Sequence, residues 1–197
     1  WLKSETGNPN SIVSNNVSSI KQNSDGDFWI VNRQGILEQI NSNTLNVVKR
    51  KPIFSDKVES DGENFRLFID NSNDVWVYSE STSFGAACYI PSINKVIRYT
   101  EHDGDYSIVN NVVKDIVQDS LGSIWIGMDH GGINIIDKKT GEISLVENIK
   151  GEMNSLPDNS ITSFFTDNTG IIWVGMYKGG LAYYHRDFFK FKLFHNN

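Results

Sequence analysis

Side chains suited to binding a small polar molecule occur in short loops that follow tryptophan-containing segments of the sequence. The five candidates combine cationic, anionic, phenolic and imidazole groups, which donate hydrogen bonds to a ligand or accept them from it. They are Arg33, Asp129, His130, Tyr177 and Lys178. We predict that they line a polar pocket for a neutral or anionic ligand, the alternative being that they are ordinary solvated loop residues.

No motif of a catalytic or metal site accompanies these residues. The histidines, His102, His130, His185 and His195, are scattered without the spacing of zinc ligands. The acidic turn at residues 23–27 lacks the distal glutamate of a calcium loop. A nucleophile elbow and a phosphate-binding loop are also missing. We therefore predict a segment without catalytic residues, cofactor or metal.

Composition argues against several classes of partner. The 197 residues carry a net charge of −6 and no extended basic run, which disfavours nucleic acids and anionic membrane surfaces. No apolar stretch reaches the roughly 20 residues that cross a bilayer. The single cysteine, Cys88, lies among small and apolar residues and is predicted to be buried and unreactive. The chain starts at Trp1 without an initiator methionine, as expected of an excised segment.

One short pattern recurs four times and predicts the fold. An Asp or Asn stands six residues before a tryptophan, and a Gly or Asn stands three residues before it. The first residue caps a tight turn, and the second adopts the left-handed conformation that the turn requires. The tryptophans are Trp29, Trp76, Trp125 and Trp173, at intervals of 47, 49 and 48 residues. Their identical positions predict packing between adjacent sheets rather than stacking on sugars.

Short alternating or apolar segments surround each tryptophan strand. In the last two repeats they are 112–118 and 161–166 before it, 133–136 and 181–184 after it, and 142–146 and 189–194 as fourth strands. Four short antiparallel strands per repeat are typical of a β-propeller blade. The linker at residues 10–17 also recurs at 154–161, and in shorter form at 107–112.

We therefore predict an all-β fold, a β-propeller segment of about four four-stranded blades. The predicted blades are 11–58, 59–104, 105–152 and 153–197, with 1–10 as a leading outer strand and linker. Four blades closing on themselves is one possible arrangement. The other is an arc of a seven- or eight-blade propeller, which we favour because the leading strand is redundant in a closed four-blade ring.

The residues 111–136 and 159–184 resemble the two-component regulator propeller repeat. Both have Trp-[Ile/Val]-Gly-Met followed by Gly-Gly, with Met128 and Met176 where the family often has threonine. The first two repeats lack both the glycine after the strand pair and the Gly-Gly pair. The resemblance is therefore specific in the second half of the chain and weaker in the first half.

This resemblance implies the periplasmic sensor region of a hybrid two-component system histidine kinase in the inner membrane. The expected partners are an oligosaccharide or other small ligand, the remaining propeller blades and a second receptor protomer. Two alternatives remain open. One is a structural or protein-interaction propeller without a ligand site, and the other is a propeller lyase or glycosidase, for which the sequence offers no motif.

Overall fold

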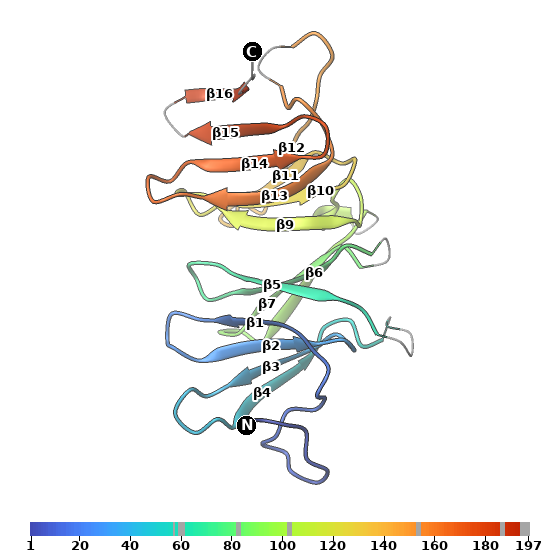
Figure 1. Ribbon diagram of the computed structural model, residues 1–197, viewed down its shortest axis with the longest axis vertical. Coiled ribbons are helices and arrows are strands. Elements are labelled where there is room, and N and C mark those ends of the chain that lie inside the picture. The colour runs from blue at the N-terminus through green and yellow to red at the C-terminus, as the bar shows by residue number, and fades with distance from the viewer. Residues whose placement is uncertain are drawn as a thin grey trace. The chain divides into compact units, whose positions relative to one another are not determined.

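The computed structural model describes residues 1–56, 58, 62–81, 84–101, 104–152, 155–185 and the backbone of 188–193. Over these residues the chain has sixteen strands in four antiparallel sheets, and one short 3-10 turn, Gly104–Tyr106. Each sheet consists of four consecutive strands that pair in chain order (Figure 1). The prediction of an all-β fold built from four-stranded blades is confirmed.

The first compact unit, Trp1–Arg98, contains the first two sheets. Blade 1 is β1 (Val17–Gln22), β2 (Phe28–Asn32), β3 (Ile36–Ile40) and β4 (Val47–Pro52). Blade 2 is β5 (Phe65–Ile69), β6 (Val75–Ser79), β7 (Ala86–Ile90) and β8 (Lys95–Tyr99). A core of aromatic and aliphatic side chains from both blades, including stacked Phe54 and Phe65, holds the unit together.

The second compact unit, Tyr99–Asn197, contains the other two sheets. Blade 3 is β9 (Val113–Gln118), β10 (Ile124–Met128), β11 (Ile133–Ile136) and β12 (Ile143–Val146). Blade 4 is β13 (Ile161–Thr166), β14 (Ile172–Met176), β15 (Leu181–His185) and β16 (Phe188–Leu193). The predicted blade ranges, 11–58, 59–104, 105–152 and 153–197, stay predictions, and their residues 59, 153 and 194–197 lie outside the described residues.

The repeated aspartate binds both its own turn and the tryptophan. In each of three turns one carboxylate oxygen accepts the backbone N–H groups two and four residues ahead. The other oxygen accepts the indole N–H, at 3.0 Å for Asp70 and Trp76, 3.1 Å for Asp119 and Trp125, and 3.0 Å for Asp167 and Trp173. The sequence predicted only the turn, whereas the carboxylate also fixes the orientation of the indole ring.

Two of the tryptophans pack against the following blade of the same unit. Trp29 is 1% exposed and meets the Tyr89 ring edge-on, with centroids 5.8 Å apart. Trp125 is 2% exposed and lies 4.8 Å from the Tyr184 ring centroid. The prediction of packing between blades is confirmed for these two indoles.

A close approach between blades 3 and 4 explains the glycine of the Trp-Ile-Gly-Met motif. A Cβ atom on Gly127 would lie 2.6 Å from Ile161 Cγ2 and 2.7 Å from the Phe164 ring. Both neighbours belong to β13, so the absence of a side chain at Gly127 lets the first strand of blade 4 pack directly on β10.

Blade 1 departs from the aspartate pattern, and the departure leaves a buried donor unpaired. Asn23 takes the aspartate position, and its single acceptor oxygen receives the Asp25 N–H at 3.1 Å. Its other polar atom is an amide nitrogen, which donates and cannot accept the indole N–H. Trp29 Nε1 is buried and has no hydrogen-bond partner.

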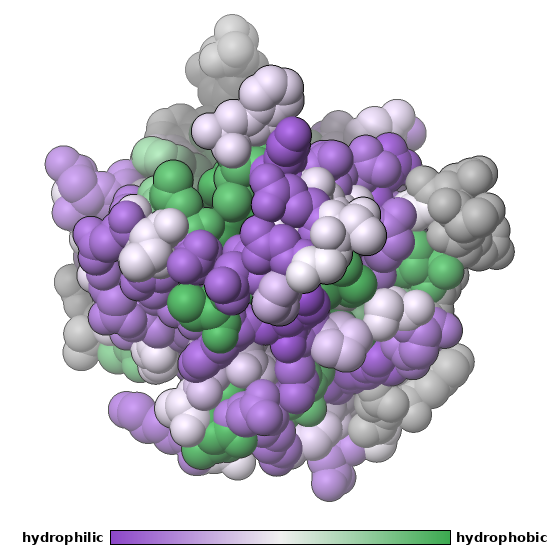
Figure 2. Space-filling view, turned by 90° about the horizontal axis from the view of Figure 1, so that it is seen from below, coloured by the Kyte–Doolittle hydropathy of each residue, from purple (hydrophilic) through white to green (hydrophobic). Residues whose placement is uncertain are grey.

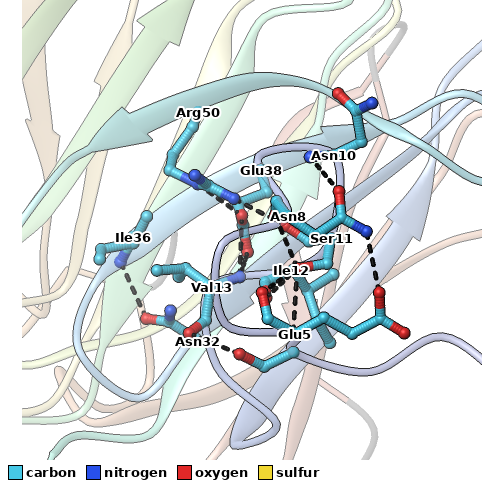
Figure 3. A network of polar contacts seen from close by, with 11 residues as sticks. Glu5, Asn8, Asn10, Ser11, Ile12, Val13, Asn32, Ile36, Glu38 and Arg50 are labelled. Atoms are coloured by element: carbon cyan, nitrogen blue, oxygen red, sulfur yellow. Dashed lines mark hydrogen bonds and ion pairs between the residues drawn. The ribbon is translucent and has the colours of Figure 1, made fainter.

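The linker that enters blade 1 is tied to the third strand by a buried carboxylate (Figure 3). Glu38 is fully buried, and both its oxygens lie 3.1 Å from the Val13 nitrogen, which donates to them. Arg50 Nε donates to Glu38 Oε1 at 2.7 Å, and Arg50 Nη2 donates to the Ser11 carbonyl at 2.8 Å. The ion pair thereby neutralises the buried charge and holds the linker on the blade.

The positions that Val13 and Glu38 occupy in blade 1 hold other matched pairs of residues in blades 3 and 4. In blade 3 the Val109 N–H donates to the side chain of buried Asn134 at 3.0 Å. In blade 4 the same two positions are Pro157 and Ala182. Proline has no N–H to satisfy, so an apolar residue is sufficient opposite it.

The leading segment differs from its predicted conformation, because Trp1–Lys3 do not form a strand. No described strand pairs with them, and Trp1 is fully exposed. Their place in the repeat is nevertheless as expected. The Ser4 N–H donates to Asn15 Oδ1 at 2.7 Å, as the backbone N–H groups of Glu101 and Asn148 do to the equivalent asparagines, Asn111 and Asn159.

The face of the molecule seen in Figure 2 is mostly hydrophilic, with hydrophobic residues in small separate groups.

The unpaired indole of blade 1 leads to a stability prediction. Asn23→Asp supplies the missing acceptor, and Asp25→Ser, which copies Ser72 of blade 2, avoids placing two carboxylates side by side. The double variant should be about 1 kcal/mol more stable than Asp25→Ser alone. Denaturant unfolding measures the difference. Asp119→Asn, which removes the same bond from blade 3, should be destabilising, and a double variant no more stable than Asp25→Ser would contradict the explanation.

The hydrogen bond between the Val109 N–H and the Asn134 side chain leads to a prediction of rescue by a second substitution. Asn134→Ala removes the acceptor of the Val109 N–H and should cost about 1–2 kcal/mol in the free energy of unfolding. Adding Val109→Pro, which reproduces the Pro157 and Ala182 pair, should recover part of that loss. In the unsubstituted chain, Val109→Pro alone should not stabilise. Equal losses in Asn134→Ala with and without the proline would show that the hydrogen bond is not what Asn134 contributes.

The turn of blade 4 leads to a prediction about acid. Hydrogen bonds from the Thr169 hydroxyl, the Trp173 indole and backbone N–H groups lower the pKa of Asp167 from 3.8 to about 2. Because this pKa is lower in the folded state, the stabilisation is complete above about pH 5 and is lost progressively as the pH falls towards 2. The urea midpoint of Asp167→Asn should therefore change less than that of the wild type between pH 5 and pH 2.5. An identical change in both proteins would refute this assignment.

Candidate ligand-binding site

Two loops at corresponding positions of the second unit carry four of the five predicted residues (Figure 1). The β10–β11 loop begins at Asp129 and the β14–β15 loop begins at Tyr177, each four residues after the tryptophan of its blade. His130 and Lys178 come next. The strands that lead into these loops are buried in β10 and partly buried in β14, so each loop follows a packed strand.

The segment Asp158–Ser160, which enters blade 4, contacts both loops. The His130 N–H donates to Ser160 Oγ at 3.3 Å, and the Tyr177 N–H donates to the Ser160 carbonyl at 2.9 Å. The Lys178 N–H donates to Asp158 Oδ2 at 3.0 Å. The structure therefore brings the two predicted loops to one shared anchor.

The side chains of these loops are exposed and already oriented by one another. His130 Nδ1 lies 2.8 Å from Asp129 Oδ1, with the His130 side chain 83% exposed. Tyr177 is 70% exposed, and Lys178 Nζ lies 5.5 Å from the centroid of its ring. The His130 backbone has φ = 56°, an uncommon conformation for a residue with a side chain. Together they present an aromatic face, a carboxylate, an imidazole and an ammonium group to solvent.

The Gly-Gly pair of the motif is required by the backbone around the first loop. A Cβ atom on Gly132 would clash with the Val146 carbonyl oxygen, and the φ of Gly132 is +65°. A Cβ atom on Gly131 would lie 2.6 Å from Asn110 Nδ2, which donates to the Asp129 carbonyl at 2.7 Å. Side chains at these positions would displace the loop that carries Asp129.

Arg33 lies in the first unit, on the loop between β2 and β3. Its N–H donates to the Asn16 carbonyl at 3.0 Å, and its carbonyl accepts the Glu63 N–H at 2.8 Å. The residue is half-buried, and its Nε is buried without a hydrogen-bond partner. The anchor at Ser160 does not include Arg33, so the structure groups four of the five predicted residues.

Two surface hollows of the second unit lie apart from these loops. One, of about 710 Å³, is lined by 104–107 and 140–143. The other, of about 400 Å³, is lined by 148–152 and 155–157. None of the five predicted residues lines either hollow. The pocket that these five residues were predicted to line stays a prediction.

Other sequence predictions can be compared with the described part of the chain. No group of three His, Cys, Asp or Glu residues there is placed to hold a metal ion, and His102 and His195 lie outside it. Cys88 is buried, as predicted. No helix among the described residues has the length and apolar character needed to cross a membrane.

Sequence reasoning missed Asp158 and Ser160, although the linker that contains them was recognised as a repeat. The signal was present in the alignment of the linkers. Asp158 aligns with Ser14 of the first linker and with Asn110 of the third, all of which have side chains that cap turns. Only the structure shows that Asp158 also binds the neighbouring loop.

Four-stranded blades, a carboxylate-bound indole in three of them and polar loops at corresponding positions define a β-propeller repeat protein. The sequence model of the two component regulator propeller matches residues 107–130 and 155–178. The two matches lie in blades 3 and 4, and each spans the linker, the tryptophan turn and the start of a candidate loop.

Solved structures support the fold. The extracellular domain of BT3049 from B. thetaiotaomicron, described as a hybrid two component system, is 22% identical with a TM-score of 0.65, over 92% of this chain and 25% of that chain. The extracellular domain of BT4673, from the same organism and described as a one component system, is 20% identical with a TM-score of 0.62, over 87% and 22%. The present chain thus spans about a quarter of these structures.

Virginiamycin B lyase from Staphylococcus aureus shares the fold as well. It is 14% identical with a TM-score of 0.61, over 87% of this chain and 53% of that chain. At this identity the likeness concerns the fold alone. No curated protein matches the sequence.

Proposed function

We propose that this chain is part of the extracytoplasmic sensor propeller of a hybrid two-component regulator, and that blades 3 and 4 bind an oligosaccharide through the β10–β11 and β14–β15 loops. One observation carries the proposal. Two exposed polar loops, on the repeats that match the regulator family, meet at a common anchor. The likeness to extracellular domains of B. thetaiotaomicron regulators supports a periplasmic location.

The chemistry of the loops suits a sugar chain. The exposed Tyr177 ring offers an apolar face for the C–H groups of a pyranose. Asp129 accepts hydrogen bonds from hydroxyl groups, and His130 both donates and accepts. Lys178 adds a positive charge for an acidic sugar. A small ligand with many hydroxyl groups uses all of these groups at once.

Signalling requires that the ligand bind two receptor states with different affinity. A sugar bridging the loops of blades 3 and 4 favours the state in which the two blades have the spacing seen here. In a dimeric receptor this preference shifts the relation between protomers, and the signal passes to a kinase elsewhere in the protein. The segment itself then has a binding role and no enzymatic role.

A second, structural role is favoured by one face of blade 4. Phe165, Trp173 and Tyr183 are paired across the strands and so share the face opposite to blade 3. Phe165 is 66% exposed, whereas the corresponding faces of blades 1 and 3 are covered by the next blade. We propose that a further blade of the same repeat covers this face. The lyase or glycosidase alternative rests only on a shared fold.

The ligand proposal is tested with polysaccharides of contrasting charge. Immobilised dextran, pectin and heparin are titrated with the 197-residue chain. At least one should bind, and Tyr177→Ala should weaken that binding about two- to tenfold through loss of ring stacking. Leu121→Ala, which also shortens an exposed side chain of the second unit, is the matched control and should bind normally.

Two results would count against the oligosaccharide site. One is that none of the three polysaccharides binds. The other is that Tyr177→Ala binds as well as the wild type, which would leave the structural role of blade 4 as the better account.

A further inference from the structure

We infer that Asp158 and Ser160 are positioning residues that join the β10–β11 and β14–β15 loops into a single binding surface. The joining of the loops stands on hydrogen bonds alone, and its consequence for an oligosaccharide rests on the proposed function. Neither residue needs to touch the sugar, because each acts through the backbone of a loop residue.

Ser160 connects the two blades directly. It is 4% exposed and lies just before β13. Its hydroxyl oxygen accepts the His130 N–H of blade 3, and its carbonyl accepts the Tyr177 N–H of blade 4. The two acceptors belong to one buried residue, so neither loop can shift without moving Ser160 or breaking a hydrogen bond.

Asp158 fixes Ser160 and the second loop at the same time. Its Oδ1 accepts the Ser160 N–H at 2.9 Å, and its Oδ2 accepts the Lys178 N–H at 3.0 Å. The Ser160 hydrogen bond is the largest cause of a lowered pKa at Asp158, with the Lys178 bond next among the lowering effects. The carboxylate is therefore ionised at neutral pH and is a strong acceptor for both N–H groups.

Asn159, which lies between Asp158 and Ser160, adds a further connection to the β10–β11 loop of blade 3. The Asn159 carbonyl accepts the Gly132 N–H at 2.8 Å, and Asn159 Oδ1 accepts the Asn148 N–H at 2.6 Å. Gly132 closes the β10–β11 loop that carries Asp129 and His130. Three consecutive residues thus bind the two loops, and a displacement of this segment moves both.

The first linker shows what the carboxylate adds. Ser14, at the position of Asp158, has one oxygen, which accepts the Asn16 N–H at 3.1 Å. It caps the same turn but has no second acceptor for the loop of its own blade. Asn110 in the third linker does have a second group, and its Nδ2 donates to the Asp129 carbonyl. The linkers of blades 3 and 4 are therefore both equipped to hold a polar loop.

Hydrogen exchange of backbone amides in the 197-residue chain tests the inference without a ligand. Asp158→Asn keeps one acceptor oxygen but replaces the acceptor of the Lys178 N–H with a donor. Exchange at Lys178 should accelerate directly, and exchange at His130 and Gly132 should accelerate at least about threefold through the shared anchor. Ser160→Ala should show the converse, a direct effect at His130 and a transmitted effect at Lys178.

Two comparisons separate this result from general destabilisation. The Ile126 amide in the buried strand β10 should keep its wild-type rate in both variants, and Ser14→Ala should leave both loops unchanged. Acceleration confined to Lys178 in Asp158→Asn, and to His130 in Ser160→Ala, would overturn the inference. So would equal acceleration at Ile126, because the loops would then report only overall unfolding.

The polysaccharide titration supplies the functional arm. If dextran, pectin or heparin binds the wild type, Asp158→Asn should weaken that binding by at least about threefold while Ile126 exchange is unchanged. Binding lost in Tyr177→Ala but retained in Asp158→Asn would refute the positioning role and leave the proposed function intact. If none of the three binds the wild type, the proposed function fails, and the exchange data still decide whether the loops move as one.

Discussion

The hydrogen bond between a turn carboxylate and an indole N–H links the turn to the tryptophan strand in three of the four blades. A buried indole must satisfy its N–H, and here the acceptor is the aspartate that also closes the preceding hairpin. The turn therefore sets the direction of the Trp125 ring, which then packs on Tyr184 of the next blade. The turn in this way helps to orient a ring that makes contact between sheets. Blade 1 lacks the bond, because Asn23 leaves the Trp29 donor unpaired, although Trp29 still packs on Tyr89.

Most of the fold was predictable because its determinants are local. Each tryptophan lies six residues after its turn residue, and strands of four to six residues follow from alternation and short apolar runs. The contacts of the linkers were harder to predict, because a linker residue such as Val13 bonds to a side chain, Glu38, that is 25 residues away in the sequence. Position in the repeat did not predict the conformation of Trp1–Lys3, which occupy the place of an outer strand but form no strand among the described residues.

In the candidate site, too, some residues could be predicted from the sequence and others could not. Asp129 and Tyr177 were identified because they occupy one register position after a recognisable strand. The anchor was not, because a serine and an aspartate in a turn look like ordinary capping residues. The sequence also did not show which of the five residues belong to the same compact unit, and Arg33 lies in a different unit from the other four. Spacing predicts which loops correspond to one another, whereas only the fold shows which loops share a hydrogen-bond partner.

The division of work between backbone and side chain explains how such loops vary without loss of the fold. The first residue of three loops, Arg33, Asp129 or Tyr177, donates its N–H to the carbonyl just before the inner strand of its own blade, at 3.0, 3.0 and 2.9 Å. That bond is indifferent to the side chain, so a cation, an anion and an aromatic ring occupy one position. Differences in ligand chemistry can therefore accumulate at this position, while coupling between neighbouring loops depends on linker residues such as Asp158.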